Sequence, residues 1–212
     1  SIPKVTGIPR IGLKMAKPVR NSLGPLLLHH GCDRSLAELV LEGKISPIPS
    51  ENKYDWLGPG IYFWVDSPSR AMTWAREKQQ KKPEEMAEPS VLGAFAYPGH
   101  CLNLTDYGAL DELRVAYEKV KLVVESEGGK LPSNGAKENG IYLYRPLDCL
   151  VIKMVHKLRE ESGLEAYDSV YGIFVEGKDL FPGSGFKTKS HAQIAIRNPE
   201  CIAGYFRVPD FT

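Results

Sequence analysis

Two short stretches decide the fold that this sequence predicts: Leu27-Leu28-His29-His30-Gly31 and, about thirty residues later, Leu57-Gly58-Pro59-Gly60-Ile61-Tyr62-Phe63-Trp64. The first is typical of a short buried strand. Adjacent strand residues point to opposite faces, so at most one of the two histidines faces a cleft, and the pair does not chelate one metal ion. The second is a glycine–proline turn that leads into an aromatic strand, in which Tyr62 offers a flat ring and a hydroxyl.

Each stretch also has a plain structural interpretation. Taken alone, the first is better explained by a buried, hydrogen-bonded histidine in front of a turn. The second fits an aromatic core strand as well as it fits a binding surface. Further strands are expected where short apolar runs lie between turn residues, and helices where apolar residues recur at helical spacing. The expected strands cover 91–97, 170–175, 191–196 and 201–207, and the expected helices about 35–43, 68–82, 107–125 and 146–160.

Helix signals support these ranges. Ser35 and Glu38 have capping-box spacing, and Ser67 precedes Pro68 at a helix start. Strands interrupted by an inserted helical pair indicate an α+β fold rather than a doubly wound one. We therefore expect one domain over residues 25–212, with a helical insertion at about 105–165, preceded by a basic extended arm over residues 1–24.

The charges are almost balanced, since 27 Lys and Arg oppose 26 Asp and Glu in 212 residues. Five of the basic residues lie in the first 24 positions, which hold no acidic residue, so the remaining chain is acidic. This balance argues against a generic nucleic-acid coat or a polybasic membrane binder. No apolar run is long enough to cross a membrane. The four scattered cysteines favour neither a zinc site nor a disulfide scaffold, so a cytoplasmic protein is expected.

Together, and in this order, the two stretches resemble the ADP-ribosyltransferase superfamily, in its poly(ADP-ribose)-polymerase-like branch. That branch has a His-Gly strand end, a Gly-x-Gly-Ile/Leu-Tyr-Phe strand and a Ser-rich helix start. Here these are His30-Gly31, Gly58 to Phe63, and Ser67 to Ala71. Near the C-terminus, Ala192 to Pro199 is similar to the family's Asn-Glu-Tyr-Ile-Val-Tyr-Asp-Pro, which puts Gln193 in the place of the catalytic glutamate.

The resemblance implies a split β-sheet core with an NAD cleft, no metal, and cleavage of the nicotinamide–ribose bond of NAD, which is consumed. His30 would bind the adenosine ribose, the Gly31 backbone would hold the nicotinamide amide, and Tyr62 would stack on the nicotinamide ring. Further residues are expected to contact NAD, with Arg34 nearest to its diphosphate: Arg34, Gly60, Ile61, Phe63, Trp74 and His191.

Two positions depart from the family pattern. Arg70 stands where the family has a small hydroxyl residue, and Gln193 can form hydrogen bonds but cannot act as a base. The acceptor is then nucleophilic enough to need no base, or Glu176 or, second, Glu200 replaces the missing carboxylate, or the enzyme is weak or inactive. Glu176 is explained slightly better as a solvated strand end. The loop at 181–187 lies where this family contacts its acceptor.

The resemblance therefore implies a mono-ADP-ribosyltransferase that modifies a protein or a nucleic acid without building polymer. Such an enzyme fits a toxin or effector delivered into a target cell, with an immunity or antitoxin protein as partner. An NAD glycohydrolase and a catalytically silent NAD- or ADP-ribose-binding module are the alternatives. A relative of tRNA phosphotransferase would need more arginine and histidine in the cleft. No dinucleotide-binding glycine motif, P-loop or H-E-x-x-H sequence is present.

Overall fold

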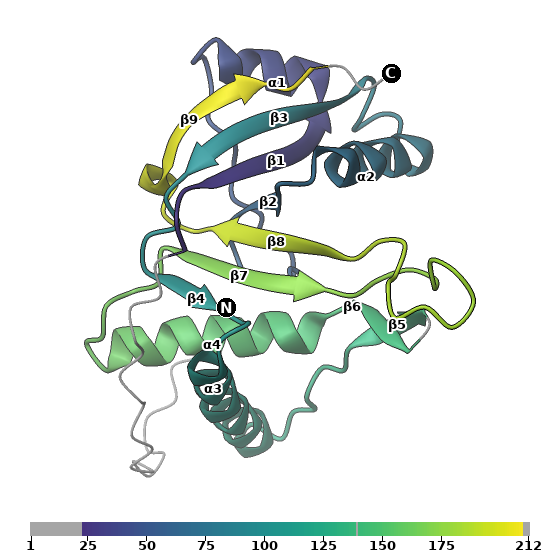
Figure 1. Cartoon of the computed structure of the whole chain (residues 1–212). Coiled ribbons are helices and arrows are strands. Elements are labelled where there is room, and N and C mark those ends of the chain that lie inside the picture. Colours follow the sequence, from purple (N-terminus) through teal and green to yellow (C-terminus); the bar gives the residue numbers. More distant parts are fainter. Residues whose placement is uncertain (1–22, 139, 210–212) are drawn as a thin grey trace.

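The computed structural model describes residues 23–138 and 140–209, so the predicted arm at 1–24 lies almost wholly outside the described residues. Figure 1 shows the chain as a ribbon. In chain order, its elements are β1 (Leu26–Asp33), α1 (Arg34–Leu41), β2 (Ile61–Val65), α2 (Pro68–Lys81), β3 (Pro89–Ala96), β4 (Cys101–Asn103), α3 (Tyr107–Ser126), β5 (Gly135–Glu138), β6 (Ile141–Tyr144), α4 (Pro146–Glu161), β7 (Ser169–Phe174), β8 (His191–Ile196), a 3₁₀ turn (Pro199–Cys201) and β9 (Ile202–Arg207).

A seven-stranded mixed sheet in the order β4-β7-β8-β2-β1-β3-β9 forms the centre of the fold. β4 and β7 are parallel, and the other neighbouring strands of this sheet are antiparallel. β5 and β6 form a separate hairpin that the sequence did not predict. The described residues thus form an α+β fold with four α-helices, as the sequence predicted.

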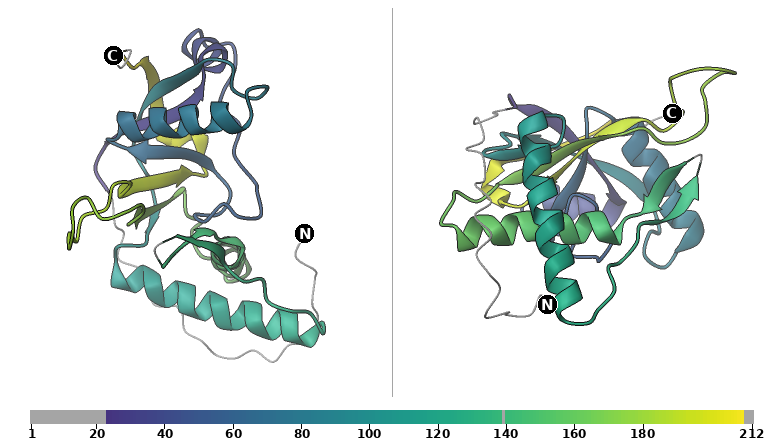
Figure 2. Two further views of the ribbon diagram at one scale, coloured as in Figure 1. Left: turned by 90° about the vertical axis from the view of Figure 1, so that its right-hand side faces the viewer. Right: turned by 90° about the horizontal axis from the view of Figure 1, so that it is seen from below.

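The helices cover different parts of this sheet (Figure 2). α1 and α2 pack near β1 and β3, whereas α3 and α4 pack on each other beside the β4 end. The largest group of buried apolar residues joins these last two helices to the strands, and it includes Leu102, Val120, Val155 and Val170. α3 and α4 lie where the sequence predicted two helices, and their apolar faces complete the core.

A buried polar network joins α3 to α4. The Arg159 guanidinium donates from Nη1 to Glu112 Oε1 at 2.9 Å, and the Tyr167 hydroxyl donates to the same oxygen at 2.8 Å. Arg159 and Glu112 are almost fully buried. Because a buried charge is costly unless it is paired and hydrogen-bonded, this network ties α3 to α4 in one arrangement.

The sheet parts between β1 and β2. β1 pairs with β3 over eight residues, but its register with β2 is limited to Leu28 opposite Val65 and His29 opposite Trp64. Beyond that point the backbones separate, and the His30 imidazole reaches the Tyr62 carbonyl oxygen at 2.7 Å. The His30 side chain therefore takes the place of the next backbone hydrogen bond between β1 and β2, and a cleft opens there.

Two local predictions need correction. α1 is capped by Asp33 rather than Ser35, because β1 continues past Gly31 and the Asp33 carboxylate accepts from the Ser35 backbone N–H at 3.0 Å. Ser67 occupies the N-cap position of α2, as expected, but its hydroxyl forms no capping hydrogen bond. The remaining predicted helices and strands lie within a few residues of their expected places, as is usual for element ends.

Candidate active site

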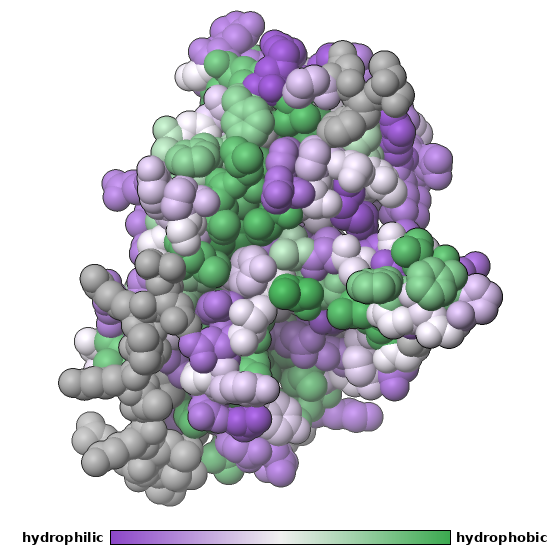
Figure 3. Space-filling model, viewed as in Figure 1, coloured by the Kyte–Doolittle hydropathy of each residue, from purple (hydrophilic) through white to green (hydrophobic). Residues whose placement is uncertain are grey.

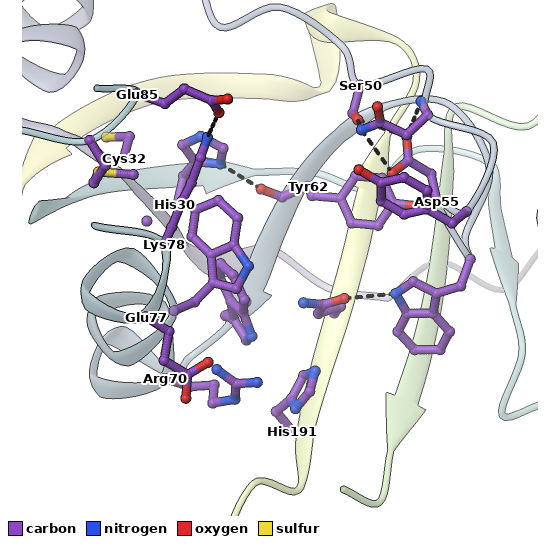
Figure 4. Close-up of a pocket in the computed structure, with 18 of the residues that line it drawn as sticks. His30, Cys32, Ser50, Asp55, Tyr62, Arg70, Glu77, Lys78, Glu85 and His191 are labelled. Atoms are coloured by element: carbon purple, nitrogen blue, oxygen red, sulfur yellow. Dashed lines mark hydrogen bonds and ion pairs between the residues drawn. The ribbon is translucent and has the colours of Figure 1, made fainter. Parts of the chain in front are cut away.

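A cleft of about 1010 Å³ lies where the sheet parts. Its walls come from β1, β2, β7 and β8, from α2, and from the β5–β6 hairpin, which contributes Leu143 and is followed by Arg145. Figure 4 shows His30 and Lys78 on one side of this cleft, Ser50 and Asp55 on the other, and Arg70 and His191 toward its lower end. The cleft thus combines residues from both halves of the chain.

His30 lines the cleft, whereas the adjacent His29 does not. A carbonyl oxygen only accepts hydrogen bonds, so the contact with Tyr62 O places the His30 proton on Nδ1. Burial lowers the pKa of the His30 imidazole, the Tyr62 hydrogen bond counters part of that shift, and the Lys78 ammonium lowers it further. A neutral ring with its proton on Nδ1 leaves Nε2 as an acceptor for a ligand hydroxyl.

His29 points to the other face of the sheet, which confirms that only one of the two adjacent histidines lines the cleft. It is 6% exposed and meets the edge of the Phe206 ring at a centroid distance of 6.2 Å. Its Nδ1 has no hydrogen-bond partner among the described residues. Burial lowers the pKa of His29. His29 is therefore a core residue in a neutral state.

The Tyr62 hydroxyl is engaged by the glycine–proline turn in front of its own strand. It donates to the Gly58 carbonyl at 2.8 Å and accepts from the Leu57 backbone N–H at 2.9 Å. Burial raises the pKa of this hydroxyl, and the Asp55 carboxylate raises it further. Gly58 has a φ of +75°, and a side chain there would meet Ile152. The hydroxyl therefore stabilises the turn, and the aromatic ring is what Tyr62 offers to a ligand.

Gln193 is held by an indole from the loop between α1 and β2. Trp56 Nε1 donates to Gln193 Oε1 at 3.0 Å, and Gln193 is 8% exposed. An indole N–H is a donor only, so the amide oxygen must face Trp56 and the NH₂ group remains to donate to a ligand. Sequence reasoning missed Trp56, because its partner lies 137 residues away and no local pattern connects them.

Glu176 lines the same cleft but does not lie beside Gln193. In the β7–β8 ladder, Gln193 faces Gly172, and the Glu176 carbonyl accepts from the backbone N–H of Lys189. Lys189 precedes Gln193 by four residues, two of them in front of β8, and four residues of extended chain span about 14 Å of backbone. The Glu176 carboxylate instead approaches Arg70 Nη2 at 3.8 Å. Glu200, the second alternative, is exposed on the 3₁₀ turn and outside the cleft lining.

His191 shares a strand face with Gln193, as expected, and also lines the cleft. Its ring stacks on Phe174 at a centroid distance of 5.4 Å, and its Nδ1 donates to the Lys189 carbonyl at 2.7 Å. Burial, together with the Arg70 and Arg145 guanidiniums, lowers the pKa of His191 to about 4, against the raising effect of that hydrogen bond. His191 is therefore neutral at pH 7.

The other predicted contacts fall into two groups. Gly31, Gly60 and Trp74 line the cleft, with Trp74 at a ring-centroid distance of 5.6 Å from Trp64. Three do not, because Ile61 and Phe63 are buried in the core and Arg34 pairs with Glu88 beside a smaller polar pocket. Strand alternation explains Ile61 and Phe63, since the neighbours of the cleft-facing Tyr62 point into the core, whereas Arg34 is the first residue of α1.

The loop between β7 and β8 projects beside the cleft and carries exposed apolar side chains. Leu180, Phe181 and Phe186 are 60%, 55% and 71% exposed. Figure 3 shows a hydrophobic area over this loop, at the right of the molecule. Exposed aromatic residues on a projecting loop are typical of a contact surface.

Neither a metal centre nor a spanning helix is found in the part of the chain that the structure describes. These residues contain no group of three or more His, Cys, Asp or Glu placed to hold a metal ion. None of the described helices has the length and apolar character needed to cross a bilayer. The four cysteines are free thiols, and burial raises the pKa of each of them.

Comparison with known proteins gives one partial likeness. The chain is 32% identical over 69 residues to the uncharacterized protein MJ0359 of Methanocaldococcus jannaschii. This match covers 32% of the present chain and 31% of the relative, so the chain spans about a third of that protein's length. No family model matches the chain, and no solved structure shows a significant match.

Proposed function

We propose that this protein is an NAD-dependent mono-ADP-ribosyltransferase built on a split sheet of the ADP-ribosyltransferase type. The observation that carries the proposal is the His30–Tyr62 contact across the parting of β1 and β2. His30, Tyr62 and Gln193 come from three strands that are neighbours in the sheet but distant in the sequence. All three line one cleft that is large enough for a dinucleotide.

Each residue has a role that its hydrogen bonds allow. The Tyr62 ring, whose hydroxyl is engaged elsewhere, stacks on the nicotinamide. His30 Nε2 accepts from a ribose hydroxyl, because Nδ1 carries the proton. The Gln193 NH₂ group donates to the nicotinamide-side ribose, because its oxygen is held by Trp56. These contacts orient the nicotinamide–ribose bond for cleavage through an oxocarbenium-like transition state.

Among the described residues that line the cleft, we find no carboxylate placed beside Gln193 to act as a general base. Asp55 accepts from the Ser50 hydroxyl and the Asn52 backbone N–H, both at 2.7 Å, and so serves the loop. The Glu176 backbone pairs with the chain at a point about 14 Å of extended backbone before Gln193. Water is a poor nucleophile without a base, so this arrangement favours transfer to a better nucleophile over hydrolysis.

The proposal is tested with NAD labelled in its adenylate part. Purified protein is incubated with labelled NAD, alone and with cell lysate, and free nicotinamide and macromolecular label are measured. We expect nicotinamide release that falls at least 100-fold in Tyr62→Ala and His30→Ala, since the first loses the stacking contact to the nicotinamide and the second the hydrogen bond to the adenosine ribose, and both contacts position NAD. Tyr107→Ala, at an exposed tyrosine at the start of α3, is the matched control.

Three results separate the functions. Label on macromolecules that depends on Tyr62 supports transfer. Nicotinamide release that lysate neither increases nor converts into labelled product indicates a glycohydrolase. Binding of NAD without release of nicotinamide under any condition would overturn the proposal and leave a silent binding module.

A further inference from the structure

The orientation of the Trp56 indole decides which end of the Gln193 amide faces a ligand. The indole donates from Nε1 to Gln193 Oε1 at 3.0 Å, which leaves the NH₂ group free to donate. The next residue, Leu57, is fully buried, and its backbone N–H donates to the Tyr62 hydroxyl at 2.9 Å. The backbone beside Trp56 is therefore fixed, and rotation about its side-chain bonds moves Nε1 toward Gln193 or away from it.

The indole has open space beside it. A groove of about 530 Å³ lies between α3 and α4 and is lined mainly by apolar side chains, among them Leu113, Tyr117 and Ile152. Trp56 and Arg145 line both this groove and the cleft. Because the groove leaves room for the ring to turn away from the cleft, packing in the core alone does not hold the indole in place.

The Arg145 side chain covers this indole. Its guanidinium lies over the Trp56 ring at 4.9 Å and over the Phe174 ring at 4.8 Å, and such a cation is attracted to the face of an aromatic ring. Its Nε donates to the Tyr142 carbonyl in β6, and its Nη1 lies 4.0 Å from the Asp148 carboxylate. Arg145 is also the N-cap residue of α4. Contacts to β6 and α4 therefore fix the guanidinium that covers the ring.

The charge of Arg145 also reaches the β8 end of the cleft. Burial is the largest cause of the lowered pKa of His191, and the Arg70 and Arg145 guanidiniums lower it as well. His191 and Gln193 share one strand face, and the His191 ring stacks on Phe174 at 5.4 Å. Arg145 thus lies close to the end of the cleft that contains Gln193.

We propose that Arg145 is a positioning residue, which holds the Trp56 indole so that Gln193 presents its NH₂ group to the nicotinamide-side ribose. This inference rests on the proposed function. Arg145 contacts no reacting atom and acts through Trp56. Hydrogen bonds to a sugar hydroxyl strengthen in the oxocarbenium-like transition state, so loss of the amide orientation should lower kcat more than it raises KM. The junction between the β5–β6 hairpin and α4 then sets the reactive end of the cleft.

The kinetic test measures nicotinamide release from NAD. Arg145→Met keeps the length of the side chain but removes the cation, so we expect kcat to fall by about 5- to 10-fold, the effect of one hydrogen bond, with a smaller change in KM. Arg145→Lys keeps the charge but not the planar group and should lie between the two. Arg114→Met is the matched control, since Arg114 is 73% exposed and lines the groove but not the cleft.

A double-variant cycle distinguishes positioning from simple support of the fold. In a Gln193→Ala background there is no amide to orient, so adding Arg145→Met should lower kcat by less than about 2-fold, the limit expected for independent sites. A residue that only stabilises the structure would lower kcat by the same factor with and without Gln193. Equal factors in the two backgrounds would overturn the inference.

A second measurement needs no NAD. The Trp56 indole N–H is observed by NMR in ¹⁵N-labelled protein and assigned by its absence in Trp56→Phe. A hydrogen-bonded N–H is protected from exchange with solvent, so Arg145→Met and Gln193→Ala should each speed up this exchange. Arg145→Lys gives the same readout if Arg145→Met does not fold.

The two measurements separate the inference from the proposed function. If nicotinamide is released but exchange of the indole N–H is unchanged in the Arg145 variants, the inference is overturned and the enzymatic activity remains. If nicotinamide is never released, the proposed function fails, and faster exchange in the Arg145 variants still supports the hold of Arg145 on Trp56.

Discussion

Replacing Gly31 by alanine tests how the cleft is assembled. A Cβ at this position would lie 2.4 Å from the Ala71 carbonyl oxygen and 3.2 Å from an atom of the Trp74 ring. The first neighbour is helix backbone, which cannot move aside as a flexible side chain can. To bring the contact from 2.4 Å to at least 3.0 Å, α2 must move away from β1 by at least several tenths of an ångström.

The expected cost follows from this overlap. Forcing an extra methyl group into a well-packed contact costs about 1 to 3 kcal/mol. For a chain of this size, 1 kcal/mol corresponds to about 2 to 4 °C in Tm, so a loss of 2 kcal/mol would lower Tm by about 4 to 8 °C. The same displacement moves Arg70 and Trp74, which line the cleft on α2, so NAD should also bind more weakly.

Urea unfolding and thermal melting of Gly31→Ala measure the effect, and Gly204→Ala in β9 is the control. Nothing lies within 4 Å of the Cβ that Gly204 would gain, so this variant should change the stability by less than about 1 kcal/mol. Equal stability of the two variants would refute the packing argument. A stable Gly31→Ala protein that no longer binds NAD would assign Gly31 to the ligand instead of to α2.

Three further substitutions test buried polar groups. Tyr62→Phe leaves the Leu57 N–H and the Gly58 carbonyl without their partner, so urea unfolding should show a loss of about 1 to 3 kcal/mol while the ring keeps its place; an unchanged stability would contradict this. Arg159→Met leaves the Glu112 carboxylate buried and unpaired, at a cost of about 3 to 5 kcal/mol, and the double variant with Glu112→Leu should recover most of it. Burial, together with the nearby Arg197 and Arg159 guanidiniums, lowers the pKa of His156 to about 3. The stability it contributes is therefore present above the ordinary pKa of 6.5 and lost as the pH falls toward 3, so His156→Leu should lose less unfolding free energy between pH 7 and pH 3.5 than wild type, and equal losses would contradict the assignment.

The elements that the sequence predicted well are those set by local chemistry. The helix at 68–81 begins at a proline and ends before Pro83, and α3 and α4 show apolar residues at helical spacing. The cap of α1 was misplaced because Asp33 and Ser35 both suit an N-cap, and only the length of β1 decides between them. The hairpin β5–β6 was not expected, since strands of four residues carry too little periodicity to detect.

In the candidate site, too, some features follow from the local sequence and others only from the tertiary structure. The chain itself specifies a histidine before Gly31 and a tyrosine after the turn at Gly58, because strand alternation and turn chemistry act over a few residues. The pairing of Trp56 with Gln193, the separation of Glu176 from Gln193, and the convergence of Arg70 and Arg145 on His191 arise only in the folded protein. These contacts join segments dozens of residues apart, and their geometry depends on strand register and helix packing, which no local pattern encodes.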